Sequence, residues 1–276
     1  MEGNSTRLRT IQADFKLGMR MPFLFSVLGV FIGFCFDNWE SLRHFIYSSK
    51  QYSENSVICV MYYFFNSFSF GGVFSNYFAT IMAAIPFAAN YSMETEGGMC
   101  IYKITRCGSR AYVRSKFLVA SLLGGLTLFL GGLIFSALLG IYLPIVTPSK
   151  LFESQWVPYF QALNTGNGGL YMVIVLYISF LGGCLWASVG LCASVYFPSR
   201  YVAVCAPFIF RFVLTQIGRL LKLPNGLRIE LLLCARGTIY SDSVTLVVTT
   251  VAVLLLIFLC TRLFTKRIER SIWNVE

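Results

Sequence analysis

Charged residues are scarce in this chain of 276 residues, of which only 12% are Asp, Glu, Lys or Arg. Soluble domains carry about 25% charged residues. Hydrophobic residues make up 57% of the chain, and the mean hydropathy is +0.69. A water-soluble core cannot bury this much apolar surface, so the composition predicts an all-α polytopic membrane protein in a single transmembrane domain over residues 1–276.

The patterns that mark catalytic, metal and cofactor sites are missing. His44 is the single histidine, and the nine cysteines are scattered with no CxxC pair. The chain has no GxxxxGK[ST] phosphate loop and no GxSxG, HExxH or dinucleotide-binding pattern. These absences argue against an enzyme, a metal site and a cofactor in this chain. No Asp or Glu lies in the middle of an apolar run, which counts against an ion-driven carrier.

Six apolar runs predict six transmembrane helices, since a helix needs ~20 apolar residues to cross the hydrocarbon layer. Lys and Arg gather before the first run, between the second and third, and after the last, which places both termini in the cytoplasm. The net charge of +10 is then a topology signal with some attraction to anionic membrane lipid, and nucleic-acid binding is not expected. The runs cover residues 21–36, about 70–90, 117–149, 154–199, 201–221 and 243–261.

The stretch "TRLRTIQADFKLGMR" before the first run places Leu8, Ile11, Phe15 and Met19 three or four residues apart. This spacing predicts an amphipathic elbow helix over residues 1–20 that lies in the inner headgroup layer. The alternative is a basic flank with fortuitous spacing.

Glycine and proline mark special places inside the runs. Gly124-Gly125 and Gly131-Gly132 are seven residues apart, as are Gly183 and Gly190, so each set lies on one helix face. Such faces allow close helix packing, and a glycine-lined substrate surface is the other reading. Pro86 and Pro207 are expected to kink their helices or to free a carbonyl group.

Residues 211–240 predict an outer or re-entrant helical hairpin between the fifth and sixth spans. A turn at Pro224-Asn225-Gly226 separates the end of the fifth span from a second short helix. A polar stripe precedes the turn, and it could follow a translocation path or an outer vestibule, snorkel to the headgroups, or find backbone partners in the bundle. The stripe consists of Arg211, Thr215, Arg219 and Lys222, spaced four, four and three residues apart.

The densest charge lies in residues 91–116, between the second and third spans. Two acids and two glycines, Glu94, Glu96, Gly97 and Gly98, come first. Five cations follow: Lys103, Arg106, Arg110, Arg114 and Lys116. The order suggests a built cytoplasmic surface, although a positive-inside loop without a docking role would also carry these cations.

This layout resembles the membrane-spanning subunits of type-two ATP-binding-cassette (ABC) exporters. The likeness covers the basic amphipathic helix, the six spans, the cytoplasmic termini, the polar loop and the broken hairpin. The segment "ETEGGMCIYKITRCGSRAYVRSK" is similar to the loop of many bacterial permeases, which reads acidic-x-Glu-Gly, then Arg-x-Gly-x-Arg, Tyr and Ser-Lys.

The resemblance implies a coupling helix that docks into a cleft of a separate ABC ATPase subunit. ATP and Mg would then bind to that partner, with no cofactor in this chain. A second permease copy, identical or paralogous, would complete a dimer in the bacterial cytoplasmic membrane. The positions that match the coupling loop are Glu94, Glu96, Gly97, Gly98, Arg106, Gly108, Arg110 and Tyr112, and Met99 adds an apolar contact.

Short outer loops favour a simple exporter, and aromatic-rich spans suit a peptide, drug or other amphipathic cargo. Two alternatives remain open at this point: a stand-alone secondary carrier or channel, and a membrane scaffold or immunity component that translocates nothing.

Overall fold

The computed structural model describes residues 11–48, 59–69, 72–145, 159, 168–237 and 239–273, and this part of the chain is helical with no strand. Residues 1–10 of the predicted elbow helix lie outside the described residues. A helix over Ile11–Gly18, called the N-terminal helix below, begins the described part. The helices that follow are α2 (Met21–Asp37), α3 (Trp39–Ser48), α4 (Val60–Ser69), the π-helix η1 (Phe74–Phe78), α5 (Ala79–Ala84), α6 (Asn90–Glu96), α7 (Met99–Cys107), α8 (Ser109–Gly140), α10 (Gly168–Tyr196), α11 (Arg200–Leu220), the 3-10 helix η3 (Asn225–Leu227), α12 (Ile229–Leu232) and α13 (Asp242–Trp273).

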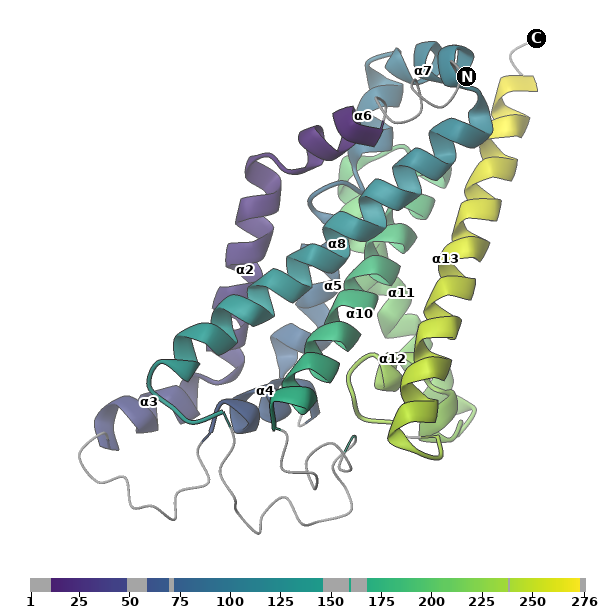
Figure 1. Ribbon diagram of the computed structural model, residues 1–276. Coiled ribbons are helices and arrows are strands. Elements are labelled where there is room, and N and C mark those ends of the chain that lie inside the picture. Colours follow the sequence, from purple (N-terminus) through teal and green to yellow (C-terminus); the bar gives the residue numbers. More distant parts are fainter. Residues whose placement is uncertain are drawn as a thin grey trace.

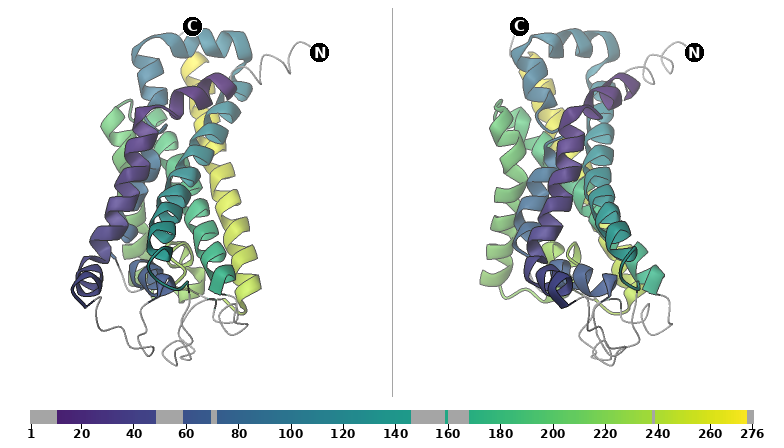
Figure 2. Two further views of the ribbon diagram at one scale, coloured as in Figure 1. Left: turned by 60° about the vertical axis from the view of Figure 1, so that its left-hand side comes forward. Right: turned by 90° about the vertical axis from the view of Figure 1, so that its left-hand side faces the viewer.

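Four of these helices, α8, α10, α11 and α13, are long and apolar enough to cross a membrane. The N-terminal helix and α2 form a fifth candidate span if they are counted together, and the angle between the two helices is 52°. The long helices run side by side as a bundle, and α7 and the N-terminal helix lie together at one end of it (Figures 1 and 2). The predicted all-helical class is therefore confirmed over the described residues, and four or five candidate spans are consistent with a membrane protein, while the six predicted spans stay a prediction.

The second predicted span is broken in the structure. It runs through η1 and α5 into a turn over residues 85–89, and the chain then continues as α6. Pro86 lies in this turn, and the helix does not continue through it because proline lacks the N–H that a continuing helix would use. Asp37 stabilises the start of the segment, accepting hydrogen bonds from the backbone N–H groups of Phe74 and Ser75, both at 2.9 Å. By contrast, α11 continues through Pro207 as one helix.

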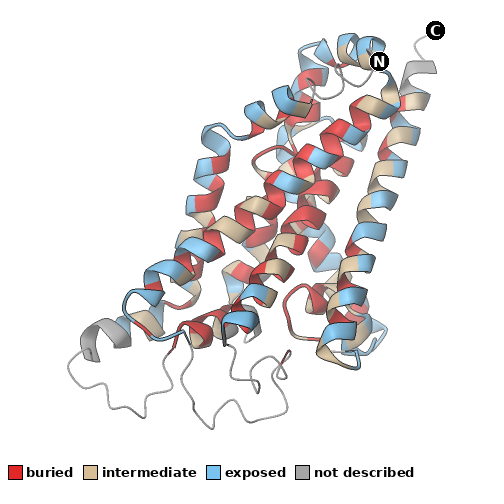
Figure 3. Ribbon diagram, in the orientation of Figure 1, coloured by how far each residue is buried: buried red, intermediate tan, exposed pale blue. Residues whose placement is uncertain are grey.

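The bundle is centred on α8 and α10. In the most apolar 18 residues of each helix, the buried share is 72% for α10 and 56% for α8. The corresponding share is 22% for α11 and 17% for α13 (Figure 3). Close packing at the centre depends on glycine: an added Cβ on Gly183 would meet the backbone of Gly124 and Gly125. The predicted role of these glycines in helix packing is confirmed, and α11 and α13 lie at the periphery.

The N-terminal helix packs closely against α8. Asp14 and Gly18 are buried and Ile11 and Phe15 are half-buried, whereas Met19 is exposed. An added Cβ on Gly18 would overlap the side chain of Leu123 in α8. The inward face thus contains Ile11 and Phe15 of the predicted apolar positions, and the Asp14 carboxylate lies beside them.

Candidate functional site: a buried ionic cluster beneath α7

Two glycines set the path of the chain at the α7 end of the bundle. Gly98 has φ of +68° and Gly108 has φ of +79°, and these values lie in the left-handed region that other residues rarely adopt. No neighbouring atom would obstruct a Cβ at either glycine. The backbone conformation alone therefore favours glycine at the two ends of α7.

Helix α7 turns one face inward and leaves an apolar group outside. Cys100 is buried and Ile104 is half-buried against the core near α8. Met99, Ile101 and Tyr102 are 60%, 66% and 79% exposed. These three side chains give the outward face of α7 an apolar character.

Lys116 of α8 lies at the centre of a buried ionic cluster, and its side chain is fully inaccessible to solvent. Its Nζ donates hydrogen bonds to Asp14 Oδ1 at 3.0 Å, Asn90 Oδ1 at 2.7 Å and Glu94 Oε1 at 2.6 Å. Phe87 and Tyr112 place their rings 5.1 and 5.5 Å from the same nitrogen. A buried ammonium is tolerated only when its donors are satisfied in this way.

Glu94 joins the cluster to α7 and to the start of α8. Lys103 of α7 donates to Glu94 Oε1 at 2.6 Å, and the Tyr112 hydroxyl donates to Glu94 Oε2 at 2.7 Å. Ser115 donates to the other Asp14 oxygen at 3.2 Å. These bonds occupy both oxygens of each carboxylate.

The cluster is balanced in charge and draws on four separate segments. Asp14 comes from the N-terminal helix, Glu94 from α6, Lys103 from α7 and Lys116 from α8. Two carboxylates face two ammonium groups, so the burial leaves no net charge to be compensated. Because its polar groups bind one another, the arrangement acts as a rigid junction between α7 and the helices beneath it.

The pKa of Glu94 reflects this environment. Burial alone would raise it, but the Lys116 charge and hydrogen bonds from Lys103, Lys116 and Tyr112 outweigh burial and hold the pKa below its ordinary value of 4.5. Burial likewise opposes the charge of Lys103, yet the bonds to Glu94 and Asp14 raise its pKa.

Acid is therefore expected to destabilise the α7 end. A depressed carboxylate pKa adds stability above pH 4.5, and this stability is lost as pH falls through the lower folded-state pKa. The thermal unfolding midpoint in detergent should be flat from about pH 8 to pH 5 and fall below it. Glu94→Gln should unfold at a lower temperature at neutral pH and respond less to acid. The exposed Glu96→Gln is the control and should follow the wild type; an equal acid response in Glu94→Gln would contradict this account.

The residues predicted for docking divide into an inner and an outer group. Glu94 and Tyr112 are buried in the cluster and cannot contact a partner directly. Glu96 is exposed and accepts a hydrogen bond from Arg200 Nε at 3.1 Å, which joins α6 to the start of α11. The exposed outer residues are Glu96, Gly97, Gly98, Met99, Arg106, Gly108 and Arg110.

Four residues that bind one another in the cluster were missed at the sequence level as site residues: Asp14, Asn90, Lys103 and Lys116. Asp14 carried one signal, because it is the single acid in the basic stretch before the first span. Asn90 and Lys116 carried none that local spacing could reveal.

The polar stripe predicted at the other end of the bundle is divided as well. Arg211 is buried; it donates to the Ser75 carbonyl at 3.2 Å and to Cys234 Sγ at 2.7 Å, beside the ring of Trp186. The Thr215 hydroxyl donates to the Arg211 carbonyl at 3.0 Å, whereas Arg219 and Lys222 are exposed. Arg211 thus joins α11 to η1 and to the segment after α12, beside a cavity of about 30 Å³ that holds no more than a few waters.

Within the described ranges, no three His, Cys, Asp or Glu side chains are grouped so that they could hold a metal ion. Comparison with protein-family models, with curated proteins and with solved structures gives no match.

Proposed function

We propose that this chain is the membrane-spanning subunit of an ATP-driven ABC exporter, with α7 as the helix that contacts a separate ATPase subunit. The observation that carries the proposal is the combination at one end of the bundle. A short helix presents Met99, Ile101 and Tyr102 outward, and a buried ionic cluster fixes the same helix to α6, α8 and the N-terminal helix.

This geometry suits the transmission of force. Movement of an ATPase against α7 would pass through Lys103 and Glu94 to Lys116, and so into α8 at the centre of the bundle. A rigid junction moves its helices together, as domain and helix shifts in switching proteins require. The N-terminal helix would move with them through Asp14.

The proposal includes six spans and a dimer. The bent first unit, the broken segment through η1 and α5, and α8, α10, α11 and α13 would cross the membrane, with both termini in the cytoplasm. The exposed apolar sides of α11 and α13 would meet lipid or the second copy. A peptide, drug or other amphipathic molecule would be the cargo of such a path.

The test is co-purification of ATP hydrolysis from native membranes. The wild-type chain should retain an ATP-hydrolysing subunit, and Met99→Asp/Ile101→Asp/Tyr102→Ala should retain at least about tenfold less, because a charged surface cannot bury against an apolar cleft. The control is Ile141→Asp/Tyr142→Ala, two residues of comparable exposure at the opposite end of α8.

Three outcomes would contradict the proposal. A wild-type chain that retains no ATPase would favour a stand-alone carrier or channel, or a membrane scaffold or immunity component. Transport in liposomes without nucleotide would favour a carrier or channel. Full retention by the α7 variant would show that α7 is not the contact surface.

A further inference from the structure

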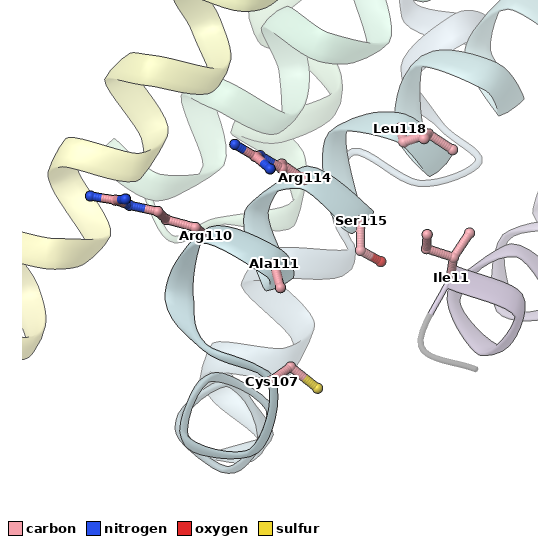
Figure 4. A pocket seen from close by; sticks show the side chains of 7 residues that line it. All are labelled: Ile11, Cys107, Arg110, Ala111, Arg114, Ser115 and Leu118. Carbon is pink, nitrogen blue, oxygen red and sulfur yellow. The ribbon is translucent and has the colours of Figure 1, made fainter. Parts of the chain in front are cut away.

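A groove at the α7 end combines a cationic rim with an apolar floor. Its volume is about 380 Å³, within the range of about 300–1,000 Å³ typical of small-molecule sites. The floor follows one side of α8, and Ile11 of the N-terminal helix faces it from across the groove (Figure 4). The lining residues are Ile11, Cys107, Arg110, Ala111, Arg114, Ser115 and Leu118.

The charges around the groove favour an anion. Arg110 and Arg114 leave α8 on the side of α13 (Figure 4), and no acid lines the groove. Glu269 of α13 is the acid nearest to Arg110, at a loose 3.9 Å. Within the described part of the chain, Arg114 has no hydrogen bond or ion pair. Asp14 lies behind Ser115, but Lys116 and Lys103 neutralise its charge.

The apolar side of the groove continues along α8 toward the middle of the bundle. Leu118 is 45% exposed and Leu122, one turn further, is 38% exposed. The order along the helix is therefore two arginines and then two leucines, from the polar end inward. This order matches the phosphate and the acyl chain of a phospholipid in the adjoining leaflet.

We infer that the groove binds one anionic phospholipid, with its phosphate between Arg110 and Arg114 and an acyl chain along Leu118 and Leu122. The inference rests on the membrane position of α8 and does not depend on an ATPase partner.

The test is lipid retention by the purified full chain in detergent micelles that contain added phosphatidylglycerol or phosphatidylcholine. Retention is measured by native mass spectrometry. The wild type should hold one phosphatidylglycerol per chain. Arg110→Gln/Arg114→Gln should bind it about thirtyfold more weakly, since each arginine near a membrane surface contributes a factor of about five. The control Lys16→Gln/Arg20→Gln removes two exposed cations of the same membrane end, outside the groove, and should change the affinity less than about threefold.

Each other outcome contradicts the inference. Equal losses in both variants would show diffuse attraction of cations to anionic lipid. Equal retention of phosphatidylcholine, which carries the same phosphate but no net charge, would show that the groove does not select an anionic headgroup. No retained lipid in the wild type would show that the groove holds no lipid. Displacement by soluble glycerol phosphate at micromolar concentration would point to a free phosphate ligand and against a lipid.

Discussion

Lys116→Met is expected to destabilise the protein by about 3–5 kcal/mol, the usual effect of removing one partner of a buried ion pair. The substitution keeps the apolar stem of the side chain but deletes the ammonium. Asp14 and Glu94 are then left buried around a site without their shared cation, and only Lys103 remains to balance them. The N-terminal helix, α6 and α7 should loosen together, whereas the centre of α8 and α10 should stay packed.

Two measurements check this expectation. Denaturant titration in micelles should give the loss of stability, and hydrogen exchange should rise over residues 90–107. Arg106→Met is the control, because it removes an exposed cation from the same region and should change the stability by less than about 0.5 kcal/mol.

A double variant distinguishes the cluster from simple loss of packing. Asp14→Asn should restore part of the stability in the Lys116→Met background, because it removes one of the two carboxylates that then share Lys103 as their single cation. The cost of the double variant should therefore be smaller than the sum of the single costs. Additive costs, or a single cost near that of the control, would show that the buried charges do not interact as the geometry indicates.

The sequence predicted the helical class and the positions of several helices, because charge and apolar runs mark them locally. The expected spans at 21–36, 201–221 and 243–261 correspond to α2, α11 and α13. The third span was expected to begin at residue 117, after the last cation, yet α8 begins at Ser109. The cations did not prevent the helix from beginning before residue 117. Lys116 is neutralised inside the bundle, and Arg110 and Arg114 lie on the exposed side of the helix.

The site could be predicted only in part, for a physical reason. The order of charges and glycines marked Glu94 and the paired glycines, and the resemblance to permease loops added Tyr112, but neither could show which of them face inward. Asp14 and Lys116 are 102 residues apart in the chain, and Glu96 and Arg200 are 104 apart. Contacts over such distances depend on how the helices pack, and helical periodicity does not record that.

Gly183→Ala is expected to cost about 1–3 kcal/mol even though alanine is the better helix former by about 1 kcal/mol. The added methyl would meet the backbone of Gly124 and Gly125, which cannot rotate away, so α8 and α10 must move apart. The control is the adjacent Gly182→Ala, whose methyl would find Trp186 Nε1 at 3.7 Å as its nearest neighbour. Gly182→Ala should therefore be neutral or slightly stabilising.

The measurement for this pair is the denaturant midpoint of each purified variant in the same micelle. Gly140→Ala extends the control to α8, since no atom lies within 4 Å of a Cβ at that position. Two apolar helices gain little from meeting each other in lipid, and their association depends on the closeness of their backbones. A lower midpoint for Gly183→Ala alone would show that this close approach holds the centre of the bundle together, and equal midpoints for all three variants would show that α8 and α10 can separate without cost.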